Sequence, residues 1–167
     1  IKSQMYELMG ATKLQSYFPI LSNYFEFYNG SKSEFTLKTR YRITRILEKL
    51  EHKIDDSYVK NFVNCEVKDV TSGKLSNVNI FVKSLPLLNV VHYLTNEYSL
   101  ASSILPNNYY ADTMKKINNP NNSAYIDVFF SFLTSKLLND YNFIHGIDCY
   151  GNFLAVKCNF LANIDED

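Results

Sequence analysis

The segment 121–156 constrains the fold most, because a long apolar helix pattern there runs directly into two apolar, strand-like segments. Asn122 or Ser123 can cap the helix by accepting hydrogen bonds from its free N–H groups. The apolar residues that follow recur at helical spacing and form one stripe, made of Ile126, Phe129, Phe130, Leu133 and Leu137. Tyr125, Val128 and Phe132 widen this stripe, so we predict a helix over 123–139 that is buried on more than one side and packed on a sheet.

Two antiparallel hairpins are predicted from apolar and polar residues that alternate on either side of a glycine. Residues 61–70 and 77–83 alternate in this way around a turn at Gly73. Residues 142–150 and 153–158 are apolar segments that flank a second glycine. We expect both hairpins to belong to the same sheet.

The N-terminal part predicts helices. Residues 3–28 predict two short helices separated near Pro19, because proline is tolerated in the first turn of a helix but not in its interior. From Thr39 onward an amphipathic helix is predicted from apolar residues at i, i+3, i+4, i+7 and i+11, namely Ile43, Ile46, Leu47, Leu50 and Ile54. Residues 84–94 predict a strand exit or a helical turn, and the polar segment 95–122 predicts a long loop or insertion.

Charge and cysteine content argue against several classes of function. The 17 Lys and Arg residues balance 17 Asp and Glu residues, so no net field draws the chain to nucleic acid or to an anionic membrane. Arg40, Arg42 and Arg45 predict the solvated face of the helix or, alternatively, an anion or partner site. The three cysteines form no Cys-x-x-Cys pair, which argues against a zinc knuckle. No apolar run approaches the ~20 residues that span a bilayer.

Four short motifs follow one another along the chain. They are Phe81-Val82-Lys83, Pro86-Leu87-Leu88, an Asn-x-x-Tyr-x-Asp pattern from Asn122 to Asp127, and His145-Gly146-Ile147-Asp148-Cys149-Tyr150-Gly151. In this order they resemble the kinase-like proteins of large nucleocytoplasmic DNA viruses, over roughly residues 60–167. The resemblance implies the small lobe of a serine/threonine protein kinase, which is an antiparallel sheet with one packed helix.

The resemblance also implies a site. A kinase needs a lysine on its third strand to neutralise the α- and β-phosphates of ATP, and an acidic residue on the adjacent helix to hold that lysine. Lys83 is thereby implied as the catalytic and ATP-binding lysine and Asp127 as its partner, with Glu97 as a reserve partner. From spacing alone, Lys83 is instead expected to end a strand in solvent, while Asp127 favours the positive end of the helix dipole.

The chain departs from the kinase pattern at the parts that bind phosphate and metal. No Gly-x-Gly-x-x-Gly precedes Lys83, and the His-Arg-Asp catalytic loop and the Asp-Phe-Gly metal site are absent from the sequence. ATP with magnesium is therefore expected only in a complete protein, and we expect no activity and no cofactor in this segment alone. His145 and Asp148 are three apart on a predicted strand, so a catalytic pair is not expected there.

These observations predict an α+β fold, with an N-terminal helical region at 1–58 and an incomplete kinase small-lobe-like domain at 59–167. The chain begins at Ile1 rather than Met, so we expect a fragment or a partly ordered region. By resemblance, it is the N-terminal part of a viral serine/threonine protein kinase-like protein that binds ATP and phosphorylates proteins once a C-terminal lobe completes it. The alternative is a non-catalytic virion structural or assembly protein on a degenerate kinase-like scaffold. Either would reside in the virion or the host cytoplasm, with protein partners and neither nucleic acid nor a membrane span.

Overall fold

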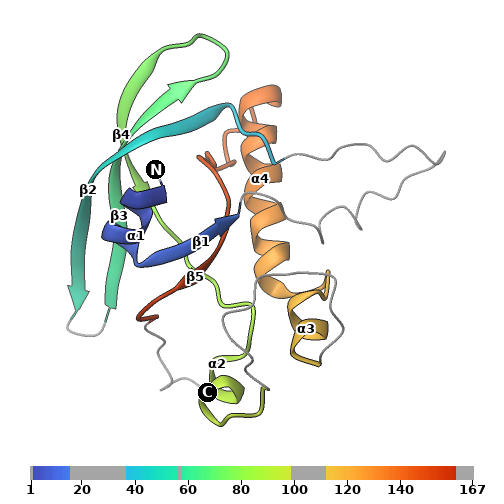
Figure 1. The fold of residues 1–167 in the computed structure, drawn as a ribbon. Coiled ribbons are helices and arrows are strands. Elements are labelled where there is room, and N and C mark those ends of the chain that lie inside the picture. Colours follow the sequence, from blue (N-terminus) through green and yellow to red (C-terminus); the bar gives the residue numbers. More distant parts are fainter. Residues whose placement is uncertain (1, 16–36, 56–57, 99–111, 161–167) are drawn as a thin grey trace, which may run out of the picture. The chain divides into compact units, whose positions relative to one another are not determined.

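The structure, a computed structural model, describes residues 2–15, 37–55, 58–98 and 112–160 (Figure 1). Its chain divides into two compact units, each assembled from separate segments. Unit 1 consists of Ile1–Gly10, Leu37–Ser84 and Ser131–Asn152, and unit 2 consists of Ala11–Thr36, Leu85–Phe130 and Phe153–Asp167. The fold is α+β with antiparallel sheets, as predicted; the division into 1–58 and 59–167 remains a prediction.

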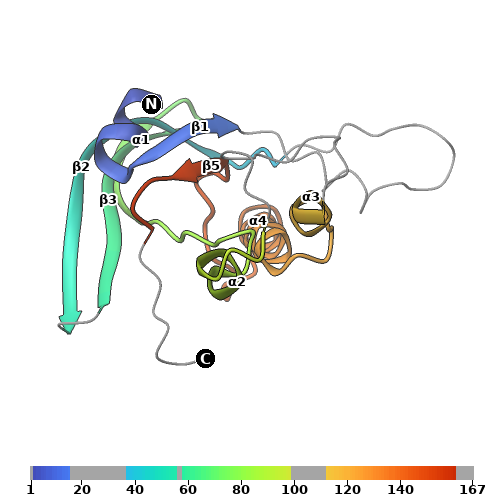
Figure 2. The same ribbon diagram turned by 60° about the horizontal axis from the view of Figure 1, so that its bottom comes forward.

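Unit 1 is built on a three-stranded antiparallel sheet in the order β2-β3-β4 (Figures 1 and 2). Its strands are β2 (Tyr41–Asp55), β3 (Tyr58–Asp69) and β4 (Leu75–Phe81). The short helix α1 (Lys2–Met9) is attached to this sheet, because the Gln4 side chain donates a hydrogen bond to the carbonyl of Ile46 at 2.9 Å. Met5 and Met9 of α1 are buried.

The hairpin predicted over 61–83 is confirmed. Val63, Cys65 and Val67 of β3 are buried while the residues between them are partly exposed, which is the period of two that a half-buried strand shows. In the turn, Gly73 has φ of +74° and donates its N–H to the Asp69 carbonyl at 2.8 Å. A left-handed backbone of this kind favours glycine, so the glycine in the sequence correctly indicated the position of the turn.

The amphipathic helix predicted in the N-terminal region is wrong, because those residues form β2. Ile43 lies opposite Val67 and Ile46 lies opposite Cys65, so the four residues of β2 from Ile43 to Ile46 lie opposite only three residues of β3. Such a β-bulge adds one residue to a strand and shifts its inward-facing positions. Further register shifts follow before Glu48 and Asp55. The first bulge gives Ile43 and Ile46 a spacing of three, which is also a spacing of residues on one face of a helix.

The helix predicted over 123–139 is confirmed as the 19-residue α4 (Ser123–Tyr141). Its start is stabilised by Asn122, whose side-chain oxygen accepts a hydrogen bond from the Ala124 N–H at 3.1 Å. The predicted buried stripe is wrong, however, because Ile126, Phe130 and Leu133 are 44%, 62% and 38% exposed. The buried residues on α4 are Ala124, Tyr125, Phe132 and Ser135, of which Tyr125 and Phe132 were predicted to widen the stripe.

Unit 2 contains a two-stranded antiparallel sheet of β1 (Ala11–Gln15) and β5 (Leu154–Lys157). The Thr12 hydroxyl reinforces the pairing by donating to the Val156 carbonyl at 3.2 Å. Helices α2 (Val90–Leu94) and α3 (Asp112–Ile117) complete the described elements. The helical turn predicted in 84–94 is confirmed by α2. The loop predicted over 95–122 is wrong at α3, and residues 99–111 of it lie outside the described part.

The predicted N-terminal helices are only partly right. The first corresponds to α1, but β1 follows it where a helix was expected, and the region around Pro19 lies outside the described residues. The helical region at 1–58 is therefore reduced to one short helix among the residues that the structure describes.

The second predicted hairpin is also wrong. Residues 142–150 form no strand, and β5 pairs with β1 in a separate sheet. The segment after α4 instead turns tightly, since Asn142 has φ of +56° and the Phe143 N–H donates to the Leu137 carbonyl at 3.1 Å. Gly146 lies so close to α4 that a Cβ there would be 2.5 Å from the Thr134 carbonyl oxygen. This contact fixes the turn against the helix.

Candidate functional site

Lys83 and Asp127, the residues implied by the kinase resemblance, belong to different units. Lys83 is exposed in unit 1, shortly after the end of β4. Asp127 is half-buried in unit 2, near the start of α4. Their pairing therefore stays a prediction.

Glu97, the reserve partner of Lys83, makes local contacts in unit 2. One carboxylate oxygen lies 3.2 Å from Nδ1 of His92, and the other accepts a hydrogen bond from the Thr95 hydroxyl at 2.9 Å. The Glu97 N–H also donates to the His92 carbonyl at 3.0 Å. Both carboxylate oxygens thus interact with the C-terminal end of α2, which gives Glu97 a structural role there.

The turns that precede Lys83 do not fit the phosphates of ATP. Between β2 and β3 the sequence is Asp56-Ser57, which contains no glycine and lies outside the described residues. The β3–β4 turn carries Gly73 alone, and a Cβ there would meet nothing within 4 Å. Gly73 is needed for its backbone conformation and not for the close approach of a ligand. The described residues also contain no group of three or more His, Cys, Asp or Glu side chains that could hold a metal ion.

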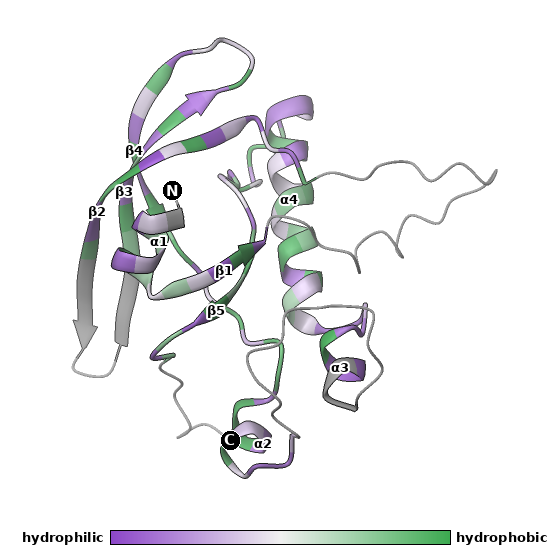
Figure 3. Cartoon of the chain, in the orientation of Figure 1, coloured by the Kyte–Doolittle hydropathy of each residue, from purple (hydrophilic) through white to green (hydrophobic). Residues whose placement is uncertain are grey.

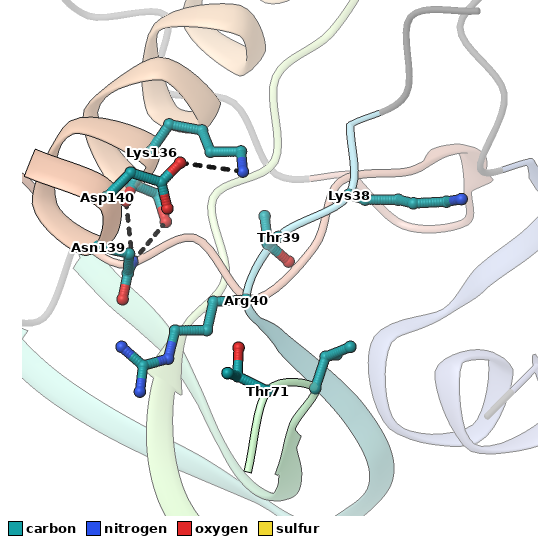
Figure 4. A pocket seen from close by; sticks show the side chains of 9 residues that line it. Lys38, Thr39, Arg40, Thr71, Lys136, Asn139 and Asp140 are labelled. Atoms are coloured by element: carbon teal, nitrogen blue, oxygen red, sulfur yellow. Dashed lines mark hydrogen bonds and ion pairs between the residues drawn. The ribbon is translucent and has the colours of Figure 1, made fainter. Parts of the chain in front are cut away.

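A polar pocket of about 430 Å³ lies within unit 1 (Figure 4). Three segments line it: the residues leading into β2, the β3–β4 turn and the last turns of α4. Their lining residues are Lys38, Thr39, Arg40, Val70, Thr71, Ser135, Lys136, Asn139 and Asp140. We call this the unit 1 pocket.

On the sheet side of the pocket, an ion pair joins the start of β2 to the end of β3. Nη2 and Nε of Arg40 lie 2.9 and 3.2 Å from the same carboxylate oxygen of Asp69. The other oxygen of Asp69 accepts hydrogen bonds from the N–H groups of Thr71 and Ser72 at 2.8 and 3.3 Å. The Arg40 guanidinium above all, and the two turn N–H groups in addition, lower the pKa of Asp69 to about 2. The carboxylate therefore stays ionised and holds the turn in place.

On the helix side of the pocket, α4 contributes polar side chains, and the end of this helix is hydrophilic (Figure 3). Lys136 forms an ion pair with Asp140 at 3.2 Å. The Asn139 amide donates to the Ser135 carbonyl at 2.8 Å and to the Asp148 carboxylate at 2.7 Å, which ties α4 to the segment after it. Ser135 is only 3% exposed. Its hydroxyl accepts a hydrogen bond from the Asn139 amide at 3.4 Å, so this buried polar group has a partner.

Polar side chains line the pocket, but they lack the paired nucleophile and base that nucleophilic catalysis requires. Two of its cations, Arg40 and Lys136, are already paired with carboxylates. None of the lining residues is a histidine or a cysteine, so no hydroxyl there has an imidazole base beside it. Asp148 accepts from Asn139, while the His145 ring lies edge-on to Phe143 at a centroid distance of 5.6 Å.

The sequence did not reveal this pocket, because its residues come from three distant segments and form no local motif. Of the pocket residues, the sequence patterns point to Arg40 alone, and they place it in a predicted helix. In the structure Arg40 directly precedes the strand β2. Pairing between Arg40 and Asp69 could be found from sequence only if the β2–β3 register were already known.

Comparison with known proteins gives no match: no protein-family model, no curated protein and no solved structure corresponds to this chain. Among the described residues, no helix is both long and apolar enough to cross a membrane. The resemblance to viral kinase-like proteins therefore depends on the four sequence motifs.

Proposed function

We propose that this chain is the N-terminal, small-lobe-like part of a viral serine/threonine protein kinase-like protein. The observation that carries the proposal is the order of the elements. The antiparallel strands β2, β3 and β4 lead to Lys83, which lies two residues beyond β4. The short helices α2 and α3 follow, and then the long helix α4 and the strand β5. A kinase small lobe places its phosphate-binding lysine on the third strand and its acidic partner on the next helix.

In this proposal Lys83 and Asp127 have different roles. The ammonium group of Lys83 contacts the phosphates of ATP in the complete protein, as a point charge on a flexible stem. Its exposure after β4 leaves it accessible to a ligand. Asp127 positions that ammonium group. The remaining phosphate contacts and the magnesium ligands belong to a C-terminal lobe, because the described residues do not fit them.

A second candidate is a non-catalytic virion structural or assembly protein that retains only the scaffold. One observation of the sequence favours it: Asp56-Ser57, the two residues between β2 and β3, include no glycine, and an aspartate there would repel a phosphate. In this case the sheet would serve contacts with other virion proteins, and Lys83 would be a solvated residue at a strand end.

Transfer of phosphate from ATP to protein, measured on the complete protein with magnesium, distinguishes the two candidates. Lys83→Met removes the charge and keeps much of the side-chain volume, so we expect activity to fall at least about 100-fold, as for loss of one preorganised charge-stabilising group. Asp127→Asn should lower activity less, because an amide still orients the ammonium by a hydrogen bond. Lys74→Met is the matched control, since Lys74 is an exposed lysine in the β3–β4 turn of the same sheet.

Two results would contradict the kinase proposal. Transfer by Lys83→Met at the wild-type rate would remove Lys83 from the mechanism. A complete wild-type protein that folds, yet neither binds ATP nor transfers phosphate, would favour the scaffold. Thermal unfolding of each variant shows whether a loss of activity reflects a loss of fold.

A further inference from the structure

The two edges of the unit 1 sheet differ in how they are protected. An edge strand exposes unpaired N–H and C=O groups, and proteins protect such edges with bulges and charged side chains. Strand β2 has both, since its register with β3 shifts at three places. Its first ten residues include four charged ones, namely Arg42, Arg45, Glu48 and Lys49. The β2 edge is therefore poorly suited to pairing with another strand.

Strand β4 has neither form of protection. It runs Leu75-Ser76-Asn77-Val78-Asn79-Ile80-Phe81, without a charged residue or a proline. Its register with β3 is continuous from Leu75 to Phe81. Among the residues that the structure describes, no strand pairs with its outer edge. Leu75 and Phe81 are 53% and 51% exposed, so apolar side chains lie uncovered at both ends of the strand.

We propose that the outer edge of β4 pairs with β4 of a second copy of this chain. The two strands run antiparallel about a twofold axis at Val78, and the two sheets join into one. Identical surfaces meet across such an axis, so each residue contacts a partner that contacts it in return.

The sequence of β4 is complementary to itself in this pairing. Leu75 of one copy lies opposite Phe81 of the other, and Asn77 lies opposite Asn79. These residues alternate along the strand and share one face. Both kinds of contact already occur between β3 and β4, where the rings of Phe62 and Phe81 are 5.4 Å apart and the Asn64 amide donates to the Asn79 side-chain oxygen at 2.6 Å.

Charge favours a second copy over a charged partner. The paired segment has no formal charge, so self-pairing places no like charges opposite each other, and a charged peptide would find no complementary group on the strand. Lys74 and Lys83, on either side, fall outside the paired residues. A single strand pair is smaller than the ~1,200–2,000 Å² of a stable specific interface, so the dimer should dissociate on dilution.

Sedimentation velocity of the whole chain over a range of concentrations tests the proposal. In the antiparallel pair the two copies of residue 77 are diagonal neighbours on one face, close enough for long side chains to interact. We expect the wild type to dimerise as concentration rises. Asn77→Lys and Asn77→Asp should each dimerise about fivefold more weakly, and an equimolar mixture of the two should regain the wild-type affinity.

The matched control is Ser131→Lys, which adds the same charge at an exposed position of α4 and should dimerise as the wild type does. Circular dichroism confirms that each variant is folded. A wild type that stays monomeric at every concentration would overturn the proposal, even if an unrelated extended peptide bound to the edge. Dimerisation of Asn77→Lys with wild-type affinity would overturn it as well, because the dimer would then use another surface.

Discussion

Phe132 and Phe130 provide a matched pair of truncations that tests which face of α4 is covered. Both are phenylalanines on the same helix, but Phe132 is 7% exposed and Phe130 is 62% exposed. Replacement by alanine removes the same atoms at both positions, so the two variants differ only in where those atoms lie. The periodicity of the sequence placed Phe130 in the main apolar stripe and Phe132 beside it, whereas the structure buries only Phe132 of the two.

The expected magnitudes follow from these exposures. Full burial of a Phe side chain is worth about 1.5–3 kcal/mol in transfer free energy, and the cavity left behind raises the cost of Phe→Ala at a buried site to about 3–5 kcal/mol. We expect that cost for Phe132→Ala. For Phe130 roughly 0.4 of the side chain is covered, which corresponds to about 0.6–1.1 kcal/mol. The better helix propensity of alanine offsets about half of this, so Phe130→Ala should change stability by no more than about 0.5 kcal/mol.

Urea denaturation followed by far-ultraviolet circular dichroism measures the two free energies of unfolding. The two variants should differ by at least about 2 kcal/mol, which corresponds to ~4–8 °C in melting temperature for a chain of this length. Equal midpoints for the two variants, or a lower midpoint for Phe130→Ala, would refute the placement of the buried face.

Three further predictions concern particular contacts. Gly146→Ala should lower the free energy of unfolding by about 1–3 kcal/mol, because the new Cβ would lie 2.5 Å from a backbone oxygen of α4; a variant as stable as the wild type would show that the turn is looser. Asp69 has a pKa of about 2 in the folded protein, below its usual 3.8, so its stabilising effect is present above about pH 4 and is lost as the pH falls toward 2. Acid titration of stability should therefore be less steep in Asp69→Asn than in the wild type, and identical profiles would contradict the ion pair with Arg40. Tyr125→Phe should cost about 0.5–1.5 kcal/mol, because the buried hydroxyl donates to the Ile117 carbonyl at 2.8 Å; thermal unfolding without a shift would argue against this bond.

Local signals in the sequence were sufficient for the β3–β4 hairpin and for α4. The hairpin combines alternation with a glycine that the turn requires, and the helix combines a capping Asn122 with a long apolar run. The covered face of α4 was not predictable in the same way. Apolar residues surround most of the helix, so their pattern does not identify the covered side, and the polar Ser135 at a buried position was misleading.

Non-local structure accounts for the remaining errors. Strand β2 was mistaken for a helix because bulges set the spacing from Ile43 to Ile46, and bulges depend on the partner strand. The β-branched and aromatic residues Tyr41, Ile43, Thr44 and Ile46 were a signal for a strand. The partner of β5 could not be found from sequence, because β1 lies near the other end of the chain and alternation does not specify a partner.

The candidate sites, too, depend on contacts between distant segments that the sequence does not specify. Lys83 and Asp127 were recognisable because each belongs to a short motif, whereas their pairing depends on how distant segments come together. The unit 1 pocket has no motif, since Arg40 and Asp69 meet only through the pairing of β2 with β3.

Chemical labelling of the complete protein with an acyl-phosphate derivative of ATP tests the role of Lys83 most directly. This probe acylates lysines that lie beside the bound phosphates, and mass spectrometry then identifies the modified residue. We predict that Lys83 is labelled and that excess ATP prevents the labelling, while any labelling of the exposed Lys74 is insensitive to ATP. Absence of ATP-sensitive labelling at Lys83 in the folded, complete protein would contradict the proposal that this lysine contacts nucleotide phosphates.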